Sequence, residues 1–178
     1  MADDVVLLDT AGRPAGTAPK ASVHHRATPL HLAFSCHVTD ADGAVLVTRR
    51  SLSKAAWPGV WTNSFCGHPR PDEAFEHAVV RHAEHELGLR LTAIAPVIPD
   101  FRYRAVDAGG VVENEVCPVY TAVADGPVRP DPGEVMEFAW VAPSDLAAAI
   151  ASAPWAFSPW LVLQAVHLDF LTMQRRPK

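Results

Sequence analysis

Two short segments of the chain place reactive side chains two residues apart. Cys66 and His68 lie in the segment TNSFCGHP, and Glu113 and Glu115 lie in VVENEVCPVY. In an extended segment, side chains i and i+2 point to one face, so each pair would present both of its groups to the same space. A thiol, an imidazole and two carboxylates can bind a divalent metal or transfer protons. For either pair taken alone, a chance spacing of polar residues is the alternative.

The bulk composition narrows the class of partner. The chain has 178 residues, of which 49% are hydrophobic and 20% charged, and its net charge is -5. This length fits one domain that can bury a core without disulfides. The net negative charge argues against a general nucleic-acid binder, although local Lys and Arg clusters can still hold an anionic ligand. We therefore expect small-molecule partners and no nucleic acid.

The cysteine count and the hydropathy pattern predict the cellular compartment of the protein. Cys36, Cys66 and Cys117 are an odd number of cysteines, in a chain too long to need a disulfide framework, which indicates a reducing compartment. The start MADDVVLLD has no signal-peptide pattern. The most apolar stretch, residues 146–171, is interrupted by prolines and Asp169 and does not resemble a membrane span. We expect a cytoplasmic monomer without a membrane partner.

The elements that must position these residues are mixed strands and helices, which predicts an α/β (α+β) domain with a central mixed sheet flanked by helices. A hairpin turn is expected at residues 40–43 and a polar approach segment at residues 13–29. Helices are expected from residues 72, 143 and 158. Strands are expected at residues 5–8, 31–39, 44–49, 100–106, 113–123 and 136–141.

The clearest helix is predicted over residues 72–87. Apolar residues recur there at helical spacing from Phe75 to Leu87. Asp72 is the expected N-cap, because its side chain can accept a hydrogen bond from the first turn. Gly88 is the expected stop, because glycine adopts the left-handed conformation that ends many helices.

This helix and its approach, GHPRPDEAFEHAVVRHAEHELGL, match the spacing of the Nudix box, with Gly67, Arg81 and Glu86 in place. In Nudix hydrolases the helix carries several carboxylates that gather divalent metals around a diphosphate. Here His82 and His85 occupy the first two of the usual Glu positions in the block that follows the Arg. A neutral imidazole cannot offset metal charge as a carboxylate does, so ordinary pyrophosphate hydrolysis is disfavoured.

Further motifs make the resemblance more specific. They are HLAFS, LVTRRSLSKAAWPGVWTNSFCGHP, PDFRYRA, ENEVCPVY, EVMEFAWV and PWAFSPW, with LLDTAGRPAGTAPK in a looser form. From about Lys20 to Trp160, the chain strongly resembles the type I isopentenyl-diphosphate Δ-isomerase family, which is built on the Nudix fold. The resemblance implies a single Nudix-type domain over residues 1–178. Its core would span about 30–165, with an N-terminal strand and active-site approach in 1–29.

The resemblance implies a function and four catalytic residues. The family interconverts isopentenyl and dimethylallyl diphosphate in isoprenoid biosynthesis, by adding a proton to the terminal methylene and removing one from C2. Cys66 and Glu115 match the thiol and carboxylate that flank the carbon chain as acid and base. Trp160 matches an aromatic that would stabilise the tertiary carbocation, and Tyr103 a phenol that assists proton transfer. A core position for Trp160 and a sheet-supporting role for Tyr103 are the alternatives.

The resemblance also implies a metal site formed by His24, His31, His68, Glu113 and Glu115. Three imidazoles and two carboxylates suit Mn²⁺ or Zn²⁺ better than Ca²⁺, which prefers oxygen ligands. Taken singly, each histidine is more often a surface or hydrogen-bonded residue than a ligand. Glu115 would be both a ligand and a proton-transfer group, with its pKa tuned by the ion.

The diphosphate needs cations, and three basic residues match family positions: Lys20, Arg50 and Lys54. Glu86 and the main-chain oxygen of Cys66 would hold a Mg²⁺ that bridges the phosphate oxygens. Solvated surface charge is the alternative for each basic residue. His82 stands where close relatives often have a second Arg, so phosphate binding there is expected to be weaker or pH-dependent.

Two rival functions remain open on the sequence. A Nudix pyrophosphohydrolase would release phosphate from nucleoside or prenyl diphosphates and would depend on the helix carboxylates. A metal-dependent nucleotide-binding or sensor domain would tolerate the loss of Cys66. The replacements at His82 and His85 count against the hydrolase.

Overall fold

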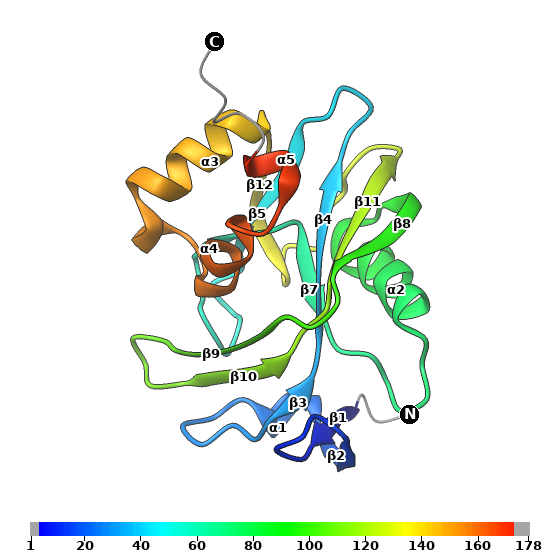
Figure 1. The fold of residues 1–178 in the computed structure, drawn as a ribbon, viewed down its shortest axis with the longest axis vertical. Helices are drawn as coiled ribbons and strands as arrows, with labels where there is room; N and C mark the ends of the chain where they lie inside the picture. Colours follow the sequence, from blue (N-terminus) through cyan, green and yellow to red (C-terminus); the bar gives the residue numbers. More distant parts are fainter. Residues whose placement is uncertain (1–3, 173–178) are drawn as a thin grey trace.

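A computed structural model describes residues 4–172, which form two sheets and a set of short helices (Figure 1). The smaller sheet has five strands in the order β2-β1-β3-β10-β9. These strands are β1 (Asp4–Leu8), β2 (Pro14–Pro19), β3 (His31–Leu32), β9 (Arg102–Val106) and β10 (Val112–Val116). β3 and β10 are parallel, and Glu115 pairs with His31. β2 lies within the approach segment expected at residues 13–29, and the sequence did not predict this strand.

The larger sheet has seven strands, with β12-β5-β4-β11-β8 in order, β6 paired to β5 and β7 paired to β4. They are β4 (Phe34–Thr39), β5 (Val45–Arg50), β6 (Trp61–Thr62), β7 (Phe65–Gly67), β8 (Arg90–Ile98), β11 (Val119–Asp125) and β12 (Val135–Val141). β4 runs parallel to β11 and antiparallel to β5. The expected mixed α+β architecture is confirmed, with its strands divided over two sheets.

Helices cover both faces of the larger sheet (Figure 1). They are α1 (Lys20–Val23), α2 (Phe75–Leu87), α3 (Pro143–Ser152), the 3-10 turn η1 (Pro154–Ala156), α4 (Pro159–Ala165) and α5 (Asp169–Thr172). Figure 1 shows α2 on one side of the sheet and α3, α4 and α5 on the other. Among the helices of residues 4–172, none is both long enough and apolar enough to cross a bilayer.

The alternation of β5 explains this layering. Val45 and Val47 are buried in the same cluster as Leu161 of α4. Leu46, between them, is buried in the cluster that contains Ala83 of α2. Successive strand residues point to opposite faces, so a strand that is apolar at every position is covered on both sides.

The predicted ends of α2 differ in their outcome. The prediction of Asp72 as N-cap is wrong, because the helix begins at Phe75 and its N-cap is Ala74, without a side-chain cap. Asp72 has φ 63, so it belongs to a tight turn before the helix. Gly88 ends the helix as expected, in the left-handed conformation with φ 55, and its N–H donates to a carbonyl of the last turn.

Two predicted strands are each divided between the two sheets. The expected strand 113–123 is interrupted at Cys117 and Pro118, and the expected strand 31–39 is interrupted at Ala33. The breaks lie side by side, since Ala33 N–H donates to Val116 O at 2.9 Å and Ser35 N–H donates to Pro118 O at 3.1 Å. Proline has no N–H to continue a ladder, which favours the break at this position. These two segments therefore cross from one sheet to the other at the same place.

Candidate active site

A cavity of about 570 Å³ is lined by residues from both sheets. Nearly all the side chains singled out in the sequence line it, namely Lys20, His24, Arg50, Lys54, Cys66, His68, Glu86, Tyr103, Glu113, Glu115 and Trp160. His31 does not line the cavity; it is fully buried, and its Nε2 lies 3.4 Å from Oε1 of the cavity residue Glu115. Residues from distant parts of the chain thus share one space, as the sequence predicts.

Strand register accounts for the meeting of these groups. Glu113 and Glu115 are both buried on β10, two residues apart, while the intervening Asn114 is only partly buried. Glu115 pairs with Tyr103 on β9 and with His31 on β3. The expectation that each i, i+2 pair faces one space holds in the structure for these two carboxylates.

Four side chains form a cluster suited to a metal ion. The ligand atoms of His24, His31, His68 and Glu115 all lie within 4.8 Å of one another. His31 Nδ1 lies 3.0 Å from Pro29 O, so it donates there and turns the Nε2 lone pair to the cluster. Within the described residues, the Nε2 atoms of all three imidazoles are buried without a hydrogen-bond partner. Such orphaned acceptors fit a divalent cation.

Glu113 extends this cluster through His24, whose Nε2 lies 3.1 Å from Glu113 Oε2. Burial raises the pKa of Glu113, and the charge of Glu115 acts in the same direction. The pKa of Glu115 is held well below its usual value, because contacts with His31 and His68 outweigh its burial. Glu115 is therefore the ionised carboxylate of the pair.

The thiol and the phenol are both held in their protonated forms. Burial raises the pKa of Cys66 to about 12, with the charge of Glu115 adding to the effect. Burial and Glu115 also raise the pKa of Tyr103, whose hydroxyl donates to Glu115 Oε2 at 2.9 Å. Two potential proton donors thus line a cavity that also contains an ionised carboxylate.

Trp160 is a buried aromatic at the first turn of α4, with 2% of its surface exposed. Its indole N–H donates to Asn63 Oδ1 at 2.9 Å. The Arg50 guanidinium carbon lies 5.5 Å from the ring centroid, and the Tyr103 ring lies at 5.6 Å. The ring is therefore both a core residue and a cavity wall, and it already accepts a cation over its π face.

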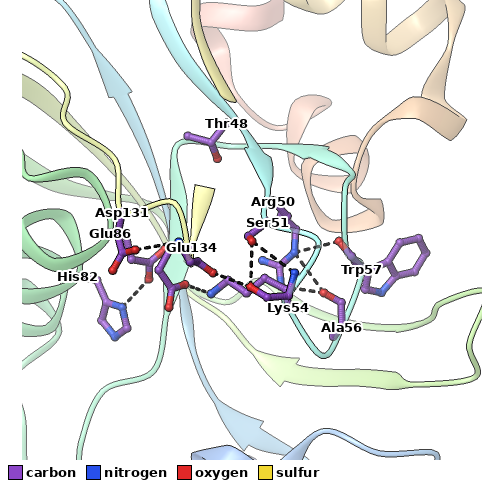
Figure 2. Close-up of polar contacts among 12 residues, drawn as sticks. Thr48, Arg50, Ser51, Lys54, Ala56, Trp57, His82, Glu86, Asp131 and Glu134 are labelled. Carbon is purple, nitrogen blue, oxygen red and sulfur yellow. Dashed lines mark hydrogen bonds and ion pairs between the residues drawn. The ribbon is translucent and has the colours of Figure 1, made fainter. Parts of the chain in front are cut away.

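The basic end of the cavity is drawn in Figure 2. Arg50 donates to the carbonyls of Ala56 and Trp57, and the Lys54 ammonium pairs with the Glu134 carboxylate. Burial lowers the pKa of Lys54, which Glu86 partly opposes. Together with Lys20, these groups give the cavity a cationic end that suits an anionic ligand.

His82, which stands where close relatives often have a second Arg, is paired with Glu86 in the structure. Its Nδ1 lies 2.8 Å from Glu86 Oε1, a contact that Figure 2 draws, and the residue is only 3% exposed. Its ring lies so close to Gly67 that an added Cβ would be 2.5 Å away. His82 does not line the cavity, but its neighbours Gly67 and Glu86 do, so it contacts the cavity wall from behind.

Several residues around the site were not identified from the sequence. Asn63 is part of the TNSFCGHP segment quoted for Cys66, so its neighbourhood was the available signal. Ser35 contacts Cys66 Sγ at 3.3 Å, and Gln164 donates to Ser35 at 2.9 Å. Glu134 pairs with Lys54 across 80 residues of chain. No local pattern predicts such long-range contacts.

The chain is similar to known proteins in both sequence and fold. The model of the NUDIX domain family matches residues 29–161. A protein named isopentenyl-diphosphate Delta-isomerase from Agromyces mediolanus is 65% identical, over 96% of this chain and 82% of its own. One of the same name from Clavibacter michiganensis is 66% identical, over 90% of this chain and 82% of its own. A solved Deinococcus radiodurans structure is similar in fold, with a TM-score of 0.69 at 18% identity, over 98% of this chain and 100% of that one.

Proposed function

This chain belongs to the Nudix family and, within it, to the isopentenyl-diphosphate Delta-isomerases, and on that premise we propose that it interconverts isopentenyl and dimethylallyl diphosphate. This reaction serves isoprenoid biosynthesis. One observation carries the proposal beyond the likeness. A single cavity holds a protonated thiol, an ionised carboxylate and a buried indole, together with three basic side chains.

Cys66 and Glu115, the latter with Tyr103, are the proposed acid and base. The reaction requires one proton to reach the terminal methylene and another to leave C2. The high pKa of the Cys66 thiol keeps its proton available until the alkene is in place, and Tyr103 shares a proton with Glu115 through their hydrogen bond. Because the reaction is reversible, the donor in one direction is the acceptor in the other.

Trp160 is the proposed stabiliser of the tertiary carbocation. A cation over a desolvated indole face gains about 2 kcal/mol. The Arg50 guanidinium carbon lies 5.5 Å from the ring centroid, and this existing cation–π contact supports the assignment. Burial of Trp160 and Tyr103 also keeps water away from a reactive cation.

The donor set fits two divalent ions. We assign the cluster of His24, His31, His68, Glu113 and Glu115 to a divalent metal, with Mn²⁺ or Zn²⁺ as the finer assignment. When bound, that ion lowers the basicity of Glu115. We assign Glu86 and the main-chain oxygen of Cys66 to a Mg²⁺ that arrives with the diphosphate, and Lys20, Arg50 and Lys54 to the phosphate oxygens.

We further propose that the enzyme is a cytoplasmic monomer of one domain. Cys36, Cys66 and Cys117 are free thiols, which a reducing compartment preserves. The lining of the cavity comes from one chain, so the proposed chemistry needs no second copy.

One incubation tests the proposed function. The protein is mixed with isopentenyl diphosphate, Mg²⁺ and Mn²⁺ in deuterated water, and the dimethylallyl product, deuterium incorporation and free phosphate are followed. We expect dimethylallyl diphosphate carrying deuterium and no phosphate release. Free phosphate without isomer would instead identify a pyrophosphohydrolase, and neither product would identify a binding domain.

A further inference from the structure

We propose that Asn63 is a positioning residue for the reaction, whose side-chain oxygen sets the Cys66 thiol and the Trp160 indole relative to one another. The inference rests on the proposed function, which gives those two side chains their roles. Asn63 itself does not line the cavity, so it would act through its partners.

The oxygen of Asn63 accepts three hydrogen bonds. The Trp160 indole N–H donates to Oδ1 at 2.9 Å, the Thr62 hydroxyl at 2.8 Å, and the Cys66 thiol at 3.3 Å. Asn63 is fully buried. In such surroundings no water replaces a lost partner, so each bond constrains geometry.

The orientation of the Asn63 amide is fixed from its other side. Nδ2 donates to Cys36 O at 3.0 Å and to Phe65 O at 2.7 Å. A flipped amide would face two carbonyl oxygens with an oxygen and the indole N–H with an NH₂ group. Both of these contacts in the flipped amide would leave buried groups unsatisfied. The amide is therefore held with its oxygen toward Cys66 and Trp160.

The chain is built to bring α4 to this amide. Asn63 lies between β6 and β7, three residues before Cys66. Ser158, the N-cap of α4, contacts the Thr62 hydroxyl at 2.8 Å, and its N–H donates to Trp61 O at 2.8 Å. The start of α4 is thereby attached to the connection between β6 and β7, and Trp160 in its first turn reaches Asn63.

The proposed substrate explains why such a fixed connection is needed. An alkene has no polar group by which the acid can be aligned, so the protein must set the distance between proton donor and π face in advance. Asn63 connects the two side chains through one atom. A displacement of about 1 Å at reacting groups can cost about 100-fold in rate.

The first test replaces Asn63 by Leu, which has a similar shape but no hydrogen-bonding groups. We expect kcat to fall about 100-fold while KM for isopentenyl diphosphate changes little, because the diphosphate contacts are untouched. The matched control is Ser64→Ala, since Ser64 is equally buried but its hydroxyl bonds only to the backbone, at Val38 and Leu46. It should lower the melting temperature and leave kcat unchanged. Equal losses of kcat in both variants would overturn the proposal.

A second readout is the alkylation of Cys66 by iodoacetamide, which needs no turnover. In Asn63→Leu the thiol loses the partner that fixes its position, so we expect the rate of alkylation to change about fivefold, the change that corresponds to one net hydrogen bond. Unchanged alkylation in a folded Asn63→Leu protein would overturn the positioning role. If the unmodified protein makes no isomer, the proposed function fails by itself, and this readout still tests the Asn63 contact.

A double-mutant cycle covers the case in which Asn63→Leu does not fold. Trp160→Phe removes the indole N–H and keeps an aromatic ring, and Asn63→Asp keeps an acceptor oxygen. We expect Trp160→Phe to lower kcat several-fold more in the unmodified protein than in the Asn63→Asp background, where the side chain no longer donates to the carbonyls of Cys36 and Phe65. Additive effects in a folded double variant would show that the two residues act separately and would sink the proposal.

Discussion

The two ends of the cavity are constructed differently. At the end that we propose for proton transfer, called the proton-transfer end below, side chains bind other buried side chains, since Asn63 joins Cys66 to Trp160 and Tyr103 donates to Glu115. At the end that we propose for the diphosphate, called the diphosphate end below, Arg50 donates to loop carbonyls, and Lys54 pairs with a carboxylate that is about as exposed as itself. The difference fits the two parts of the proposed substrate. A neutral alkene cannot orient the protein, whereas a diphosphate brings charges that can replace existing partners.

The proton-transfer end also extends into the core behind the thiol. Ser35 contacts Cys66 Sγ at 3.3 Å and accepts from Gln164 at 2.9 Å. Gln164 Oε1 in turn lies 2.9 Å from His37 Nε2. The thiol is thus supported by a series of buried contacts through Ser35, Gln164 and His37. In the described residues, no comparable series supports the ammonium of Lys54.

The sharpest test of the comparison is the removal of the thiol. Cys66→Ala should lower kcat by about 10²- to 10⁴-fold, the range for a lost general acid or base, while affinity for the diphosphate group changes little. The measurements are isomerase turnover and binding of inorganic diphosphate by calorimetry. Cys36→Ala is the control, because Cys36 is buried in the other core cluster. Near-normal turnover in Cys66→Ala would remove the thiol from the mechanism.

The second prediction concerns acid sensitivity of the core behind the thiol. Burial lowers the pKa of His37 to about 4 from 6.5, so the folded protein holds it neutral. Below pH 6.5 the unfolded chain binds a proton that the folded chain does not. The contribution of His37 to the free energy of unfolding should therefore fall by about 3 kcal/mol between pH 6.5 and 4, and this contribution should change no further below pH 4.

Urea denaturation at pH 7 and pH 4.5 measures this loss. His37→Gln is the comparison variant, since an amide N–H can still donate to Gln164 without titrating. The difference in unfolding free energy between the two proteins should shrink on acidification. An equal fall in both would assign the acid sensitivity elsewhere in the molecule.

The sequence predicted the two ends unequally well. The segments around Cys66 and Glu115 carry local motifs, and the strand register brings them together as expected. Asp72 was wrongly placed as a cap, because a left-handed turn of the chain precedes the helix. The division of the expected strand 113–123 depends on how two neighbouring segments pass from one sheet to the other. The sequence of a single segment does not predict this.

The contacts that complete each end were also beyond local patterns. Gln164 reaches Ser35 across 129 residues, and Glu134 reaches Lys54 across 80. β2 was missed because PAGTAP is mostly exposed and has a proline at each end, so it lacks the apolar alternation of a buried strand. Tertiary packing supplies the information that spacing in the sequence does not.

The third prediction tests how replaceable the partners of the diphosphate end are. Lys54→Met should raise KM by about 10- to 100-fold with a smaller change in kcat, since a charge-assisted hydrogen bond contributes about 1.5–3 kcal/mol. Glu134→Gln releases Lys54 from its ion pair and should leave KM equal or lower. Steady-state kinetics at fixed Mg²⁺ measure both. A large loss of kcat in Glu134→Gln would show that this end is as rigid as the other.

The smallest expected effect is that of His82, and it addresses the one place where the diphosphate end resembles the proton-transfer end. Its Nδ1 lies 2.8 Å from Glu86 Oε1 in a buried pair, so the imidazole orients the carboxylate proposed to hold Mg²⁺. Partners of metal ligands typically contribute about 10-fold or more in metal affinity. His82→Leu should therefore weaken Mg²⁺-dependent binding of inorganic diphosphate about tenfold, measured by calorimetry, and His82→Asn, which keeps an N–H near Nδ1, should weaken it less. His85→Leu is the exposed control on the same helix. Equal affinities in all three variants would leave Glu86 held by its own helix and make the contrast between the two ends complete.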